Sequence, residues 1–171
     1  GNCLWNSDNI SLIKGDYSYS NANGLVAFTS NSNVNITDIE DLISNKSSVS
    51  SKIEIESIKY LWDVFDLLDK TIKLDAELLY KYKKGNLHPS AILVNQDNII
   101  INEGSNISAG SVLDASEGPI ILDEYSFVDI GSLIKGPLYL GKHSKINPGS
   151  KIIGPVSIGP YSKIGGEVED S

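Results

Sequence analysis

Few side chains in this sequence are suited to acid–base chemistry or to binding phosphate. His143 and His88 are the only histidines, and an imidazole is the side chain that most often acts as a base near neutral pH. All 14 cations are lysines, so a phosphate would meet a point charge, such as the ammonium of Lys163, and not the forked guanidinium of an arginine. Cys3 is the only cysteine, which excludes an internal disulfide and a thiolate metal cluster. What these side chains can do depends on the elements that position them.

The C-terminal half of the sequence repeats every six residues. Large aliphatic residues keep this spacing without a break, at Leu122, Val128, Ile134, Leu140, Ile146, Ile152, Ile158 and Ile164. A glycine-proline pair recurs every 18 residues, at Gly118, Gly136 and Gly154, so three short units make one larger repeat. A six-residue unit suits a short strand with an inward aliphatic side chain, followed by a tight corner.

This spacing predicts a parallel β-helix of about four coils over residues 89–171, because three units close one coil and stacked coils pair as parallel β-structure. Serine follows several of the aliphatic residues by four positions, where a small side chain fits at the bend. Between Asp114 and Glu117 the phase shifts by three residues, which we interpret as a small corner loop. Residues 18 apart should therefore lie in columns.

Three candidate binding residues fall into such columns. His143 shares a column with Tyr125 and Tyr161, so it acts either as a base or as part of an outward stack of flat side chains. The stack is the simpler interpretation, because a catalytic imidazole needs a specific partner that the sequence does not identify. Lys163 shares a column with Lys145, which is typical of a solvated lysine face, with an anion site as the alternative.

We expect no metal site in this chain. His88, beside Pro89, is interpreted as a loop residue, and a zinc site made of three histidines is excluded because the sequence has two. Asp63, Asp66 and Asp69 are interpreted as the solvated side of a helix, with metal binding as the alternative.

The N-terminal half divides into two parts. Residues 1–57 are rich in Asn and Ser and carry short apolar runs, whereas residues 58–88 are predicted to form a helical linker. From Ile58 to Ile72 apolar residues recur at three and four positions, which predicts an amphipathic helix. We expect its Trp62 to be buried in the core against the preceding domain. A second short helix is predicted around residues 75–84.

Composition limits the class of partner. The formal net charge of −8 argues against nucleic acid and against acidic membrane surfaces, since both attract a basic face. The sequence has no signal peptide and no apolar run near the length of a membrane span, which indicates a cytoplasmic protein. It contains no Met and begins with Gly1, so we interpret it as a fragment.

The repeats resemble the hexapeptide left-handed parallel β-helix of acyltransferases. Three further segments extend the likeness: NGLVAF (residues 23–28), which contains the clearest strand candidate of the first part at residues 24–28, YLWDVFDLLD (residues 60–69) and IGPY (residues 158–161). Together they resemble a family of bacterial sugar nucleotidyltransferases, which are similar to the bifunctional N-acetylglucosamine-1-phosphate uridyltransferase and glucosamine-1-phosphate N-acetyltransferase. The left-handed sense of the coil is implied by this resemblance alone.

The resemblance implies a mixed fold in two parts. Residues 1–57 would be the C-terminal remnant of an α/β nucleotidyltransferase domain that lacks its glycine-rich phosphate loop, and residues 89–171 would be a truncated acetyltransferase-like β-helix. The histidine base of that family lies in a later coil, beyond Ser171, so the catalytic residue is unknown.

The same resemblance implies the site residues and partners. Lys163, Tyr161 and His143 are the candidates for binding substrate, with Lys163 near the place of the family's phosphate-binding arginine. No cofactor is expected in the fragment, whereas the full-length parent would use acetyl-coenzyme A and a nucleoside triphosphate with Mg²⁺. A sugar phosphate or nucleotide sugar would be the substrate, and copies would form a homotrimer through the β-helix.

Two functions of different class remain open. In the first, the chain is part of a sugar-phosphate nucleotidyltransferase whose β-helix resembles an acetyl-coenzyme A-dependent sugar N-acetyltransferase. In the second, the β-helix is a non-catalytic trimerisation scaffold for the nucleotidyltransferase domain, because its coils expose broad faces that association would cover.

Overall fold

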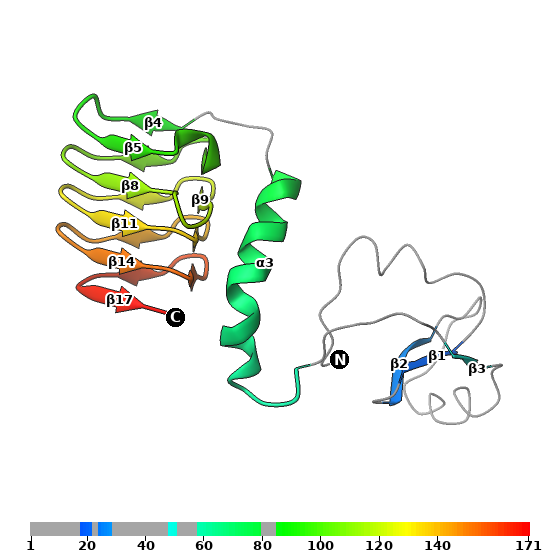
Figure 1. The fold of residues 1–171 in the computed structure, drawn as a ribbon. Coiled ribbons are helices and arrows are strands. Elements are labelled where there is room, and N and C mark those ends of the chain that lie inside the picture. Colours follow the sequence, from blue (N-terminus) through cyan, green and yellow to red (C-terminus); the bar gives the residue numbers. More distant parts are fainter. Residues whose placement is uncertain (1–17, 22–23, 29–47, 51–57, 80–84) are drawn as a thin grey trace. The chain divides into compact units, whose positions relative to one another are not determined.

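The structure is a computed structural model, and it describes residues 18–21, 24–28, 48–50, 58–79 and 85–171 (Figure 1). The chain divides into two compact units, Gly1–Leu61 and Trp62–Ser171. Each unit is built differently, and the second one carries the repeats.

The described part of the first unit is a three-stranded sheet. Its central strand β1 (Ser18–Asn21) pairs antiparallel with β2 (Gly24–Phe28) and parallel with β3 (Ser48–Ser50). The strand expected within residues 23–28 is confirmed. The prediction of a nucleotidyltransferase remnant over residues 1–57 falls mostly outside the described residues and stays a prediction.

The second unit begins with a single helix, α3 (Asp63–Leu79). The predicted helix from Ile58 and the predicted second helix around residues 75–84 are both wrong in their bounds, because α3 starts later and runs through Asp75 without a break. No glycine or proline stands within α3, so nothing in that segment ends the helix. The rest of the predicted second helix, residues 80–84, lies outside the described residues.

From Asn86 onward the chain coils into a parallel β-helix of about five turns, which confirms the predicted fold class. Each of its three faces is a parallel sheet. Face 1 consists of β4 (Asn86–Leu87), β7 (Asn106–Ile107), β10 (Phe127–Val128), β13 (Lys145–Ile146) and β16 (Lys163–Ile164). Face 2 consists of β5 (Ile92–Val94), β8 (Val112–Asp114), β11 (Leu133–Lys135), β14 (Lys151–Ile153) and β17 (Glu167–Glu169). Face 3 consists of β6 (Ile99–Ile101), β9 (Ile120–Leu122), β12 (Leu138–Leu140) and β15 (Val156–Ile158).

Two details of this architecture refine the expectation. The chain makes about five turns where about four were predicted, since β4 precedes the expected boundary at residue 89 and pairs with β7. The left-handed sense of the coil stays a prediction.

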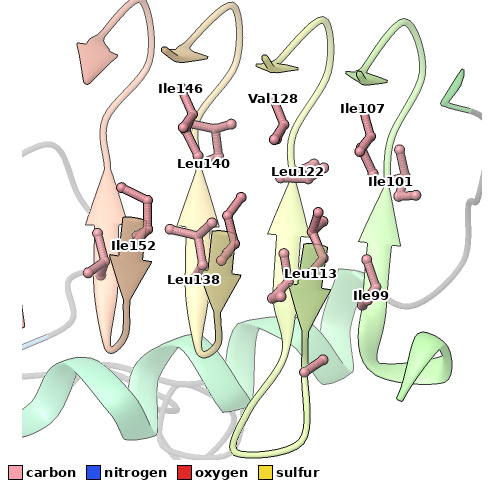
Figure 2. Packing of buried hydrophobic residues seen from close by; sticks show 14 of the residues in the cluster. Ile99, Ile101, Ile107, Leu113, Leu122, Val128, Leu138, Leu140, Ile146 and Ile152 are labelled. Atoms are coloured by element: carbon pink, nitrogen blue, oxygen red, sulfur yellow. The ribbon is translucent and has the colours of Figure 1, made fainter. Parts of the chain in front are cut away.

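Aliphatic side chains fill the interior of the β-helix (Figure 2). Seven of the eight residues of the six-residue pattern, from Leu122 to Ile158, are at most 5% exposed, and Ile164 packs against the same cluster. At the corners, small buried serines satisfy the backbone: the Ser144 hydroxyl donates a hydrogen bond to the Gly159 carbonyl at 2.7 Å. Both expectations from the repeat, inward aliphatics and small residues at the bends, are confirmed.

The first two complete turns are longer than the regular repeat. Leu133 pairs with Lys151, 18 positions later, whereas Val112 pairs with Leu133, 21 positions later. The extra residues lie between β8 and β9, which confirms the corner loop predicted at Asp114–Glu117. In the first turn the short 3-10 helix η2 (Gln96–Asn98) enlarges the same corner.

Helix α3 covers face 3. The middle residues of the face 3 strands point away from the core, because neighbouring residues of a strand point to opposite sides of the sheet. Two of them, Ile100 and Ile121, are nevertheless buried, since they pack against Ile72 and Ala76 of α3. One of the three faces is thereby removed from solvent over the first turns.

The prediction that Trp62 lies in the core is wrong. Its side chain is 62% exposed, and Leu61 and Phe65 are 83% and 52% exposed. The described contacts of the apolar side of α3 begin at Leu68, which packs on the cluster around Ile72. Helical spacing identifies the apolar side of a helix, but it does not determine how much of its length a partner covers.

Two glycines at equivalent corner positions of successive turns provide a test of this stacking. A Cβ on Gly141 would lie 2.7 Å from the Pro160 nitrogen and 2.8 Å from the Ile158 carbonyl oxygen, whereas a Cβ on Gly159 meets nothing within 4 Å. We expect Gly141→Ala to lower the free energy of unfolding by about 1–3 kcal/mol, because the backbone of the next turn must move. Gly159→Ala should change it by less than about 0.5 kcal/mol. Chemical denaturation of both variants checks the difference, and equal effects would contradict the turn spacing described here.

Candidate functional site

The turn from face 3 to face 1, corner 3–1, carries a ladder of aromatic rings. Tyr125, His143 and Tyr161 occupy the same position in successive turns and share a positive φ of 56–58°. The Tyr125 and His143 ring centroids are 5.1 Å apart at an interplanar angle of 7°, and those of His143 and Tyr161 are 5.0 Å apart at 21°. Because the same corner conformation recurs every turn, the three rings project outward in parallel. The predicted outward stack is confirmed.

The His143 imidazole is held by its neighbouring rings. Within residues 85–171, no carboxylate or hydroxyl is hydrogen-bonded to it, and the adjacent charges satisfy each other: the Lys142 ammonium and the Glu124 carboxylate are 2.5 Å apart. The hydrogen bond that the Lys142 ammonium donates to Glu124 raises the pKa of Lys142. A general base is normally oriented by a further polar group, so the geometry at His143 is that of packing and not of a prepared base.

Lys163 lies apart from the ladder, on face 1. It pairs in register with Lys145, whose ammonium is 2.7 Å from the Asp129 carboxylate and 4.8 Å from the centre of the Phe127 ring. The hydrogen bond from Lys145, together with one from the Ile130 backbone N–H, lowers the pKa of Asp129. Of the three predicted binding residues, the structure thus brings His143 and Tyr161 together and places Lys163 in a separate column of charged groups.

A polar network beside α3 has no counterpart in the sequence analysis. The Tyr139 hydroxyl donates to the Asp123 carboxylate at 2.9 Å, and the same carboxylate accepts the Asn102 amide at 3.3 Å. Burial, followed by the Asp123 hydrogen bond, raises the pKa of Tyr139 to about 12. The sequence does contain one sign of this network. Tyr139 lies in the same outward column as Ile100 and Ile121, and a tyrosine hydroxyl at a partly buried position needs a hydrogen-bond partner.

A groove of about 470 Å³ lies between α3 and the enlarged corners of the first turns. Its lining residues are Lys73, Ala76, Glu77, Asn98, Ser116, Glu117, Gly118 and Pro119. Two of its three charged members have partners within the chain: the Lys73 ammonium lies 2.7 Å from Asp69, and the Glu117 carboxylate lies 2.5 Å from Lys135. The groove is therefore a consequence of the corner insertions, and its Lys73 and Glu117 are each paired with an opposite charge.

The turn from face 1 to face 2, corner 1–2, differs from the aromatic corner in charge. We define its seam as the two tip residues of the first four turns, Pro89–Ser90, Ala109–Gly110, Ile130–Gly131 and Pro148–Gly149, together with Gly165–Gly166, which form the whole of the shorter fifth corner. None of these residues is charged, whereas the tips of corner 3–1 carry Glu103, Glu124 and Lys142. Ile130, at the middle of the seam, is 55% exposed. The seam is an uncharged strip along the β-helix.

Columns of side chains flank this seam on faces 1 and 2. Between the face 1 strands and the seam of the first four turns lie His88, Ser108, Asp129 and Asn147, and the Asp129 carboxylate is bound to Lys145. The outward strand residues that come next on face 1 are Asn86, Asn106, Phe127, Lys145 and Lys163. Those on face 2 are Ile92, Val112, Leu133, Lys151 and Glu167. Ile92 and Leu133 are 56% and 46% exposed. Both columns are uncharged over the first three turns and charged over the last two.

No protein-family model matches the chain, and no curated protein matches it significantly. The relation to sugar nucleotidyltransferases, which rests on the motifs alone, stays a prediction. The described part of the chain contains no helix that is both long and apolar enough to cross a membrane.

The aromatic ladder gives a direct test of its role. We expect His143→Asn to lower the free energy of unfolding by about 0.5–1.5 kcal/mol, because asparagine tolerates the positive φ but removes the ring from two stacked contacts. A double-mutant cycle with Tyr125→Asn, followed by chemical denaturation, should show a coupling between the two positions. Independent, additive effects would contradict a stabilising stack.

Proposed function

We propose that the β-helix is a non-catalytic assembly module that joins copies of this chain into a homotrimer through the seam. The observation that carries the proposal is the absence of charge at the tips of corner 1–2 in all five turns. Around a rotation axis each residue faces its own copies, so a charge there would repel itself. A seam that avoids charge in every turn has the composition that such an axis requires.

The exposed apolar side chains support the same location. Face 3 is buried under α3 over the first turns, so the free faces of the β-helix are 1 and 2, which meet at the seam. Ile92, Ile130 and Leu133 expose about half of their surface on or beside it. Contiguous exposed apolar residues bordered by polar ones mark interaction surfaces. The number of copies, three, comes from the resemblance to hexapeptide acyltransferases.

The enzymatic activities implied by that resemblance form a separate and weaker proposal. In the longer protein, this module would serve a sugar nucleotidyltransferase acting on a sugar phosphate and a nucleoside triphosphate with Mg²⁺. Acetyl transfer from acetyl-coenzyme A would need an oriented base, and His143 is instead packed between two tyrosine rings. The described turns therefore offer an assembly surface but no oriented base of their own, and the resemblance places the family's base beyond Ser171.

Aspartate substitutions at the seam test the assembly. We expect the unsubstituted chain to be a trimer in sedimentation velocity. Ile130→Asp or Leu133→Asp should raise the dissociation constant of the trimer at least about thirtyfold, because each would bury an unpaired carboxylate at the contact. Tyr161→Asp is the matched control, since Tyr161 is 77% exposed at corner 3–1, the end of face 1 away from the seam, and its substitution should leave the trimer intact.

Two results would contradict the proposal. One is a parent chain that sediments as a monomer at every accessible concentration. The other is a trimer that the seam variants leave unchanged while Tyr161→Asp dissociates it.

A further inference from the structure

Resting on the proposed trimer, we infer that neighbouring copies lie parallel with their turns at equal height, face 1 of one copy against face 2 of the next, with Lys163 paired to Glu167 of the adjacent copy. Lys163 and Glu167 are the outward residues nearest the seam on their two faces, and both belong to the fifth turn. A rotation axis along the seam would bring these two columns together turn by turn.

Equal height gives a compatible contact in the first three turns. Asn86 would face Ile92, Asn106 would face Val112, and Phe127 would face Leu133. None of these strand residues is charged, and the Asp129 carboxylate beside Phe127 is already paired with Lys145 of its own chain at 2.7 Å. The pair of Phe127 and Leu133 would form the apolar centre of the interface, since the Leu133 side chain is 46% exposed and needs cover.

The charged turns fit the same register. Lys145 and Lys151 would face each other in the fourth turn, but each already has an acidic neighbour in its own chain: Asp129 lies 2.7 Å from Lys145, and Glu167 lies 3.9 Å from Lys151. Within residues 85–171, no carboxylate lies within salt-bridge distance of the Lys163 ammonium. The Glu167 side chain is 69% exposed and its own ion pair is long, so it can accept this second cation.

Other arrangements of two copies pair the charged residues less favourably. An antiparallel arrangement would place Lys163 against the first turn, where Ile92 offers no counter-charge. A shift by one turn would set Lys163 against Lys151, which repels it, or Phe127 against that same lysine. Opposite charges at one end and apolar residues at the other therefore define both the direction and the register of the contact.

Charge reversal tests the pairing. We expect Lys163→Glu and Glu167→Lys each to raise the trimer dissociation constant about three- to tenfold in low salt, and the double variant carrying both changes to restore it to within about twofold of the parent. The effect should fade in high salt, because exposed ion pairs are screened. Glu169→Lys is the control, since it has the same charge on the same strand but lies two residues farther from the seam.

The outcomes separate this inference from the proposed trimer. A monomeric parent overturns both. A trimeric parent that seam aspartates dissociate, but whose double charge variant binds no better than the single ones, overturns only the pairing of Lys163 with Glu167. Thermal unfolding of each variant confirms that these exposed substitutions leave the fold intact.

Discussion

Parallel backbone pairing at a fixed spacing is the constraint on which the rest of the structure depends. Each strand bonds to the strand one turn away, as Leu133 does with Lys151 and Lys145 with Lys163. Every residue is therefore stacked on its equivalent, and the character of a column is set by the sequence at that position. Inward columns become a continuous aliphatic core, whereas outward columns bring the side chains of successive turns next to one another on the surface.

The two contrasting corners follow from this one rule. At corner 3–1 a left-handed residue projects a ring in three successive turns, so Tyr125, His143 and Tyr161 stack on one another instead of forming a reactive site. At corner 1–2 the tips are small or apolar in every turn, and the adjoining faces stay uncovered while α3 buries face 3. The residues of the columns thus make corner 3–1 an edge whose rings contact one another, and corner 1–2 an edge that is free to associate.

Sequence reasoning succeeded where the structure is periodic. The buried aliphatic residues, the loop at Asp114–Glu117 and the stack around His143 could all be predicted, because each depends only on positions within the repeat. The exposure of Trp62 and the bond from Tyr139 to Asp123 could not, since neither residue owes its surroundings to a repeated position. Packing between unlike elements has no period, and only the three-dimensional arrangement identifies these partners.

Distances between identical positions in different copies test the account most directly. Spin labels on cysteines introduced at Pro148, on the seam, and at Lys142, on the opposite corner, can be measured by pulsed electron paramagnetic resonance in a Cys3→Ser background. The account predicts short separations between copies at position 148 and clearly longer ones at position 142. The reverse order, or labels too far apart to interact at position 148, would contradict an axis along the uncharged seam.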